Sequence, residues 1–227
     1  KKLEDRSLVR TRQSMVRKQT RCKNQIKSIL LFYGIALPED WAERRWSGPF
    51  VRWLESIPME RASGEVALRI HLEELKHLRQ ILARLDREIR VLAQTEEYGV
   101  QVRLLRTIPG ISTLTAMILL TELQEISRFP SLDELASYVG LIPDTRSSGE
   151  TEHTGELTQR RHAQLRASLV EAAWVAVRKD PALLMAFQES CKRMRKTRAI
   201  VKIARKLLNR VRFVLKNQTP YQMGVVQ

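Results

Sequence analysis

The sequence has few of the residues that bend or crosslink a chain. Its 227 residues include 9 glycines, 8 prolines and 2 cysteines, and aromatic residues make up only 6%. With 43% hydrophobic residues, this composition favours helices around a core. The cysteines, Cys22 and Cys191, stand far apart, and neither has a Cys-x-x-Cys partner. The spacing therefore gives no sign of a metal site or a disulfide framework, and it fits a reducing, cytoplasmic setting.

Long apolar runs are also missing. The run from Ala116 to Leu120 is far shorter than the roughly 20 residues that span a bilayer, so we expect no membrane-spanning helix and count no membrane among the expected partners. No secretory signal peptide is recognisable. The sequence starts with Lys-Lys inside a helical pattern, and we expect it to be a piece of a longer protein lacking an N-terminal part.

Acidic residues are scarce. Against 40 Lys and Arg there are 25 Asp and Glu, which gives a formal net charge of +15. Such a chain attracts polyanions, either nucleic acid or an anionic membrane surface. Clustering favours nucleic acid, because the stretch 192–216 carries only positive charges beside an apolar stripe. From it we predict five nucleic-acid contacts: Lys196, Arg198, Lys202, Arg205 and Lys206.

Two long helices are predicted in the first half, over 1–33 and 63–94. The first carries ten positive and two negative residues. The second has apolar residues at alternating three- and four-residue spacing, typical of a coiled coil: Leu75, Leu78, Leu82, Leu85, Ile89 and Leu92. The pair could form a hairpin within one chain or a seam between two chains, with a dimer as the sharper hypothesis. Between the helices, Trp41, Trp46 and Trp53 could stack on bases or anchor the core.

Residues 98–123 resemble a helix-hairpin-helix motif, with Ile108-Pro109-Gly110-Ile111-Ser112 between two apolar helices. Such a hairpin lets backbone N–H groups meet a DNA phosphate, and Gly110 is the candidate for that approach. Ser112 stands where the motif usually has glycine, which weakens this interpretation. The alternative is a hairpin that only packs inside the domain.

The stretch 140–166 lacks a helical apolar stripe and holds two adjacent serines, three glycines and two histidines. We predict a loop there, placed between rigid helices where functional residues often lie. Just before it, Ser131 and Glu134 fit a capping box that opens a helix over 132–139. A solvated surface loop without function is the alternative.

Four segments read LLRTIPGISTLTAMILLTEL, RFPSLDELASYVGLIPDTRSSGE, LTQRRHAQLRASLVEAAW and AIVKIARKLL. In this order they resemble the C-terminal transposase domain of the insertion sequence 110 family (the 116/110/902 type), and the first helix resembles that family's coiled coil. The resemblance implies a DNA transposase whose members carry a RuvC-like N-terminal domain that binds Mg²⁺. It also implies a bridge RNA in at least some members, homo-oligomers (dimer or tetramer) formed through the coiled coil, and a prokaryotic, nucleoid-associated setting. No cofactor is expected in this chain itself.

The resemblance also implies a serine nucleophile directly before a glycine, which here is Ser148, with Ser147 as the alternative. The serine would attack a phosphodiester and form a phosphoserine intermediate. Its base is not evident beyond His153 and His162. Arginines could stabilise the phosphoryl charge, Arg166 first among them: Arg146, Arg160, Arg161 and Arg166. Arg161 and His162 stand where the family often has Gly-Asn, a departure that suggests a diverged copy.

The sequence thus predicts a mainly α fold: a long helical hairpin or coiled coil over 1–97, then a compact helical transposase domain over 98–227. That domain would contain the helix-hairpin-helix-like segment 98–123 and the serine loop 140–166. One alternative function is a non-enzymatic helical module that binds nucleic acid and oligomerises. Another is an oligomerisation scaffold without nucleic-acid affinity.

Overall fold

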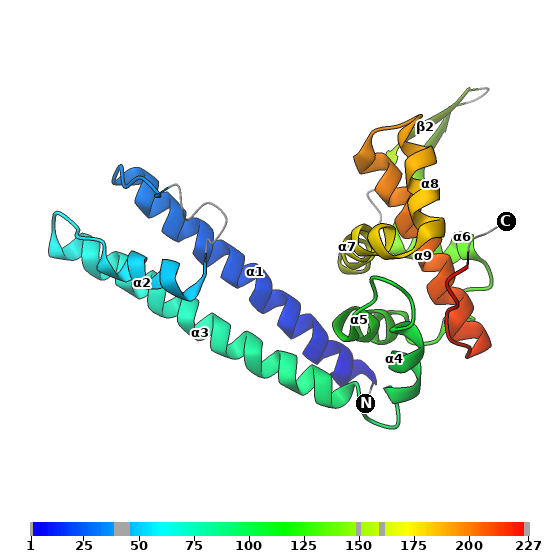
Figure 1. Ribbon diagram of the computed structural model, residues 1–227, viewed down its shortest axis with the longest axis horizontal. Coiled ribbons are helices and arrows are strands. Elements are labelled where there is room, and N and C mark those ends of the chain that lie inside the picture. Colours follow the sequence, from blue (N-terminus) through cyan, green and yellow to red (C-terminus); the bar gives the residue numbers. More distant parts are fainter. Residues whose placement is uncertain (1, 39–45, 149–150, 159–161, 225–227) are drawn as a thin grey trace. The chain divides into compact units, whose positions relative to one another are not determined.

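The structure is a computed structural model that describes residues 2–38, 46–148, 151–158 and 162–224, with the backbone alone for 143–148 and 151–157. Most of these residues are helical, which confirms the predicted mainly α class (Figure 1). The chain divides into two compact units. The helical-hairpin unit is Arg10–Glu88, and the C-terminal unit is Lys1–Val9 together with Ile89–Gln227. The predicted domain boundary between 97 and 98 stays a prediction.

In the helical-hairpin unit, α1 (Lys2–Phe32) and α3 (Ala62–Leu92) lie side by side and antiparallel (Figure 1). Arg12 Nε donates to Asp86 Oδ1 over 2.8 Å, and Cys22 Sγ donates to the His71 carbonyl over 3.3 Å. Partner numbers fall along α3 as they rise along α1, so the helices pair within one chain. Both predicted helices are confirmed, whereas a seam between two chains stays a prediction.

The short helix α2 (Gly48–Ser56) completes the core of this unit. Ser47 Oγ accepts the N–H of Phe50 over 3.3 Å and caps its start. Burial, with help from Glu74, raises the pKa of the Cys22 thiol to about 11, so that the thiol stays protonated and unreactive at neutral pH. The buried cluster gathers residues from all three helices: Cys22, Ile26, Leu30, Phe50, Val51, Leu54, Leu68, Leu72, Leu75 and Leu78.

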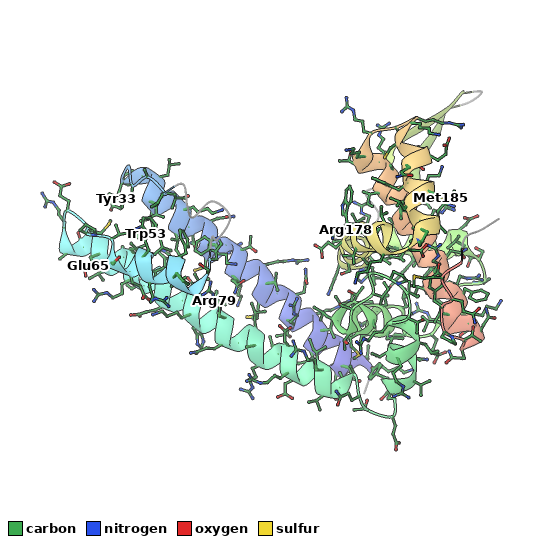
Figure 2. All side chains as sticks on the ribbon, in the orientation of Figure 1. Tyr33, Trp53, Glu65, Arg79, Arg178 and Met185 are labelled. Carbon is green, nitrogen blue, oxygen red and sulfur yellow. The ribbon has the colours of Figure 1, made fainter. Side chains whose placement is uncertain are left out.

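Two of the three tryptophans that lie between the two long helices in sequence pack against this core. The ring centroids of Trp46 and Trp53 each lie 5.6 Å from that of Phe50. Arg79 of α3 donates to the Trp46 carbonyl, and Figure 2 places Trp53 and Arg79 on this unit. These contacts favour the core-anchor interpretation for both residues. Trp41 lies outside the described residues.

The C-terminal unit is built around α9 (Lys196–Asn217), which packs against α4 (Gly99–Leu105), α6 (Leu132–Val139), α7 (Ala163–Lys179) and α8 (Pro181–Cys191). The helix α5 (Thr113–Leu123) contacts α7 and is apolar on nearly all sides; its residues from Ala116 to Leu123 are buried. The short 3-10 helix η2 (Ile126–Arg128) follows it. Within the described ranges, no helix is both long and apolar enough to cross a membrane.

Local capping signals fix several helix starts. Ser131 Oγ accepts the N–H of Glu134 over 3.2 Å, which confirms the predicted start of α6. Gly140 ends α6 at a φ of 83°, a conformation that glycine adopts without strain. Asp180 Oδ1 accepts the N–H of Leu183 over 3.1 Å, and Pro181 opens α8.

The segment predicted as a loop over 140–166 is different in the structure. Two antiparallel strands, β1 (Pro143–Ser148) and β2 (Thr151–Leu157), make a β-hairpin there. The loop prediction was wrong because neither strand has an alternating apolar face, the pattern by which a half-buried strand is recognised. Backbone pairing alone defines this element.

Candidate active site and nucleic-acid interface

The β-hairpin carries both candidate serines at the end of β1. Ser148 pairs with Thr151, Ser147 with Glu152, and Arg146 with His153. Successive positions of a strand lie on opposite faces of the ribbon, so positions 147 and 148 are not equivalent. The register also brings position 146 next to the candidate base His153. For Ser147, Ser148, Arg146 and His153, the predicted chemical roles stay predictions.

Arg166 anchors the base of this hairpin. From the first turn of α7, its Nη1 donates to the carbonyl of Gly140 over 3.1 Å and to that of Thr158 over 3.2 Å. Gly140 precedes β1 and Thr158 follows β2. One guanidinium therefore holds both roots of the hairpin, and the Thr158 N–H adds a bond to the Ile142 carbonyl over 3.2 Å. The structure thus gives Arg166 a positioning role; its contact with phosphate stays a prediction.

Replacing Arg166 with methionine is expected to loosen the hairpin roots, because two carbonyls lose a charged donor. We expect faster cleavage by a limiting protease within 140–160 and a loss of about 1–3 kcal/mol in the free energy of unfolding. Arg178→Met is the matched control, since Arg178 is an exposed arginine of the same helix (Figure 2). Equal cleavage rates in the two variants would contradict the anchoring role.

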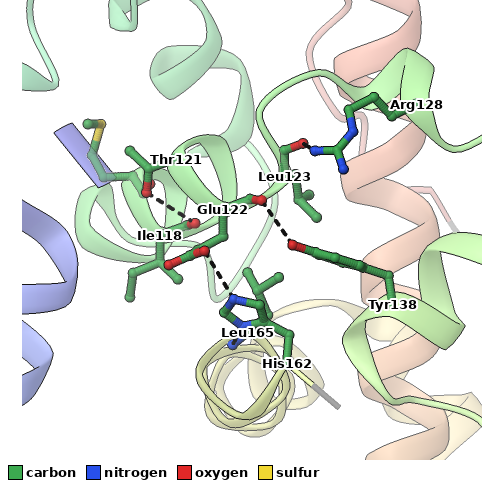
Figure 3. A network of polar contacts seen from close by, with 9 residues as sticks. Ile118, Thr121, Glu122, Leu123, Arg128, Tyr138, His162 and Leu165 are labelled. Atoms are coloured by element: carbon green, nitrogen blue, oxygen red, sulfur yellow. Dashed lines mark hydrogen bonds and ion pairs between the residues drawn. The ribbon is translucent and has the colours of Figure 1, made fainter. Parts of the chain in front are cut away.

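A buried carboxylate contacts the residue before α7, and it was not predicted from the sequence. Glu122 of α5 is fully buried, and its Oε2 lies 3.0 Å from Nε2 of His162 (Figure 3). The Tyr138 hydroxyl donates to the Glu122 carbonyl over 3.4 Å, and the Tyr138 ring centroid lies 5.8 Å from that of His162. A buried charge needs a partner, and here the partner comes from the residue before α7.

The hydrogen bonds define the protonation of His162. Its Nδ1 accepts the N–H of Leu165 over 3.3 Å and caps α7, so the ring proton stands on Nε2 and is donated to Glu122. With both ring nitrogens engaged, His162 joins α5 to α7. The expectation that His162 activates a serine would require one of these bonds to break.

The link between α4 and α5 meets α7 at Gly110. This residue has a φ of 89°, and a Cβ built on it would lie 2.2 Å from the Ala172 carbonyl oxygen. The glycine thus permits a close backbone approach to α7, which favours the packing alternative for this position. Ser112 Oγ accepts the N–H of Thr115 over 3.1 Å and caps α5. Phosphate binding by the link stays a prediction.

An exposed row of cations runs along α9. Arg198, Lys202 and Lys206 stand at four-residue spacing, opposite the buried stripe of the helix, and Lys196 is exposed at its first position. The side chains of these four residues make no ion pair or hydrogen bond within the described part of the chain. Four of the five predicted contacts are therefore available to an anionic partner, and a single-sign surface is suited to phosphate. We call these four residues the α9 cation row.

The other arginines of α9 are engaged inside the unit. Arg205, the fifth predicted contact, pairs with Asp133 of α6, and Arg212 donates to the Pro130 carbonyl. Arg210 lies 3.6 Å from the buried Asp180, which also accepts the Tyr221 hydroxyl over 2.7 Å. Burial and this hydrogen bond raise the pKa of Tyr221 to about 12. These contacts hold α9 in place and distinguish structural arginines from the α9 cation row.

Arg160 and Arg161, two further candidates for phosphate, lie outside the described residues. In the part of the chain that is described, no three His, Cys, Asp or Glu side chains gather in a way that could hold a metal ion.

Comparisons with known proteins bear on the same region. The sequence profile described as "Transposase IS116/IS110/IS902 family" matches residues 102–189. The chain is 27% identical over 172 residues to the transposase for insertion sequence element IS1328 of Yersinia enterocolitica, covering 74% of this chain and 48% of that protein. It is 24% identical over 180 residues to the transposase for insertion sequence element IS1111A of Coxiella burnetii, covering 76% and 46%.

A third relative is the pilin gene-inverting protein of Moraxella lacunata, 32% identical over 161 residues. That match covers 67% of this chain and 49% of that protein. The chain thus spans about half the length of these curated relatives, and the profile match encloses the whole β-hairpin and its anchors.

Proposed function

This chain belongs to the transposase IS116/IS110/IS902 family, and from that premise we propose that it cleaves and exchanges DNA strands of a mobile element through a serine nucleophile. The observation that carries the proposal is the family match over 102–189, which contains the paired strands with Ser147 and Ser148. The residues that anchor the hairpin lie within the same match. Ser148 is the proposed nucleophile and Ser147 the alternative.

In the proposed reaction, Ser148 Oγ attacks a DNA phosphorus atom and a strand hydroxyl leaves. The serine proton passes to a base, either His153 or a carboxylate outside these residues. The phosphoserine bond keeps the broken end on the protein and conserves the bond energy. A DNA hydroxyl then attacks the same phosphorus atom, and the serine oxygen leaves with a proton. Arg146, Arg160 and Arg161 are proposed to stabilise charge on the phosphoryl oxygens.

The partners are proposals as well. DNA is the substrate, a bridge RNA is the guide, and copies of the chain associate through the coiled coil as a dimer or tetramer. The α9 cation row and the link at Gly110 are proposed to contact nucleic acid. Mg²⁺ would be held by a RuvC-like domain outside these 227 residues, where it would assist strand cleavage.

The test uses the full-length gene product that carries this chain, incubated with Mg²⁺, the RNA of its element and end-labelled DNA. We expect a protein–DNA adduct that survives denaturation. Ser148→Ala should abolish this adduct and leave DNA binding nearly unchanged, whereas Ser147→Ala should retain it. If the adduct were lost in Ser147→Ala but kept in Ser148→Ala, Ser147 would be the nucleophile.

A second candidate function is a non-enzymatic nucleic-acid-binding module, which the α9 cation row favours. It predicts salt-sensitive binding of nucleic acid and no adduct in any sample. An adduct lost on substitution of either serine would exclude it. A scaffold without nucleic-acid affinity would be excluded by binding that weakens steeply as salt rises.

A further inference from the structure

An open, shallow groove lies along the helical-hairpin unit, in a part of the chain that the family match does not cover. It has a volume of about 620 Å³. Seven of its lining residues belong to α1, and six of these, all but Ile29, form one exposed face of that helix; the eighth, His71, belongs to α3. The eight are Arg17, Thr20, Arg21, Asn24, Gln25, Ser28, Ile29 and His71. The six recur at three- and four-residue spacing, as one face of an α-helix requires.

The charge of the groove is positive. No carboxylate lines it, and α1 from Arg10 to Phe32 carries seven Lys and Arg and no acidic residue. The side chains of Arg17 and Arg21 make no ion pair in the described ranges of the chain. They stand one turn apart, about 6 Å along the helix axis, a separation comparable with that of neighbouring phosphates on one strand. An arginine fork matches two phosphate oxygens, so this pair suits successive phosphates.

The neutral lining suits the sugar part of the same ligand. Thr20, Asn24, Gln25 and Ser28 all carry groups that donate and accept hydrogen bonds. His71 adds a buried Nδ1 that makes no hydrogen bond in the described structure, with Glu74 Oε2 at 3.7 Å, beyond hydrogen-bonding distance. A buried polar atom normally has a hydrogen-bond partner. The unpaired Nδ1 beside this face therefore favours a ligand group in the groove over a helix face that only contacts solvent.

We propose that this groove binds the phosphodiester backbone of a nucleic-acid strand, at a site separate in sequence from the α9 cation row. Arg17 and Arg21 contact two successive phosphates, and the amides and hydroxyls between them contact the sugars. The site reads no bases, because phosphate contacts position a strand without specifying its sequence. The site rests on the proposed function only in taking nucleic acid as the ligand.

The test measures affinity of the whole chain for a single-stranded oligoribonucleotide and for the oligodeoxyribonucleotide of the same sequence, over a range of salt concentrations. Arg17→Gln with Arg21→Gln is expected to weaken binding by about tenfold or more and to lower the salt slope by about 1–2. Lys18→Gln with Lys27→Gln is the matched control. It removes the same charge from exposed positions of the same helix that do not line the groove, and should weaken binding less than about threefold.

The two oligonucleotides distinguish the sources of the backbone. A larger loss for RNA assigns the site to a ribose backbone, because a 2′-OH both donates and accepts. Equal losses of affinity for RNA and DNA would mean that the groove binds the backbone of either nucleic acid. Asn24→Ala with Gln25→Ala, which leaves the charge unchanged, should also weaken binding of the preferred strand.

Equal affinities for the groove pair and the control pair, with binding otherwise intact, would overturn the groove proposal alone. Absence of nucleic-acid binding in every sample, the unaltered chain included, would overturn the proposed function as well. All variants lie on the solvent face of α1, and their helix content should match the unaltered chain by circular dichroism.

Discussion

Gly110→Ala is expected to destabilise the C-terminal unit by about 2–5 kcal/mol, of which about 1–2 comes from the positive φ and about 1–3 from overpacking. The φ of 89° disfavours any Cβ, and the added Cβ would lie 2.2 Å from the Ala172 carbonyl oxygen. That oxygen belongs to the backbone of α7, whose neighbour Ala173 is fully buried. The helix therefore cannot move aside as a flexible side chain could.

The matched control for this change is Gly34→Ala. Gly34 also has a positive φ, 66°, but a Cβ there would meet nothing within 4 Å. Denaturant unfolding of both variants separates the backbone term from the steric term, since only Gly110 has both. Equal losses of unfolding free energy would show that α7 yields to the new methyl group and would contradict the close packing.

Glu122→Ala is expected to cost about 3 kcal/mol or more, because the His162 N–H loses its acceptor and the fully buried glutamate side chain leaves a cavity. The His162 Nε2–H would then face a buried void beside Tyr138. Glu122→Gln should lose much less, since an amide oxygen can still accept the proton from His162. The measurement is the free energy of unfolding, with near-ultraviolet circular dichroism reporting the packing of Tyr138.

Glu125→Ala controls for the loss of a negative charge near the end of α5. Glu125 is exposed and pairs with Lys2 over 3.8 Å, and surface pairs of this kind contribute little to stability. If the glutamine variant were as unstable as the alanine variant, the hydrogen bond to His162 would not be the stabilising contact. Unchanged stability in both would contradict a buried, partnered Glu122.

The helices were predictable because their signals are local. The apolar spacing along α3 and the Ser131 cap of α6 each lie within a few residues of the structure they specify. The break at Asp180 and Pro181 is equally local. The same holds for the α9 cation row, since its single sign and its spacing opposite the apolar stripe are both visible in the sequence.

The candidate site was less predictable because its contacts join distant segments. Glu122 and His162 are 40 residues apart, and no periodic pattern links them. A single acidic residue inside the apolar run of α5 was the available signal, since a helix apolar on all sides buries whatever it carries. Arg205 and Arg166 were expected at phosphate because a sequence cannot tell an exposed arginine from one that bonds to Asp133 or to two carbonyls.

The pairing of β1 with β2 is irregular at one point, and this irregularity decides which residues lie opposite each other in the rest of the hairpin. Pro143 pairs with Leu157, but Thr145 pairs with Thr154, so β2 holds one more residue than β1 over this interval. Without that extra residue, the register of the Pro143–Leu157 pair would continue along the hairpin. Ser148 would then lie opposite Glu152 instead of Thr151. Insertions or deletions of one residue between Thr151 and Leu157 would therefore change the cross-strand neighbours of both serines, whereas most substitutions there would not. The length of this segment, more than its composition, is what the serine position depends on.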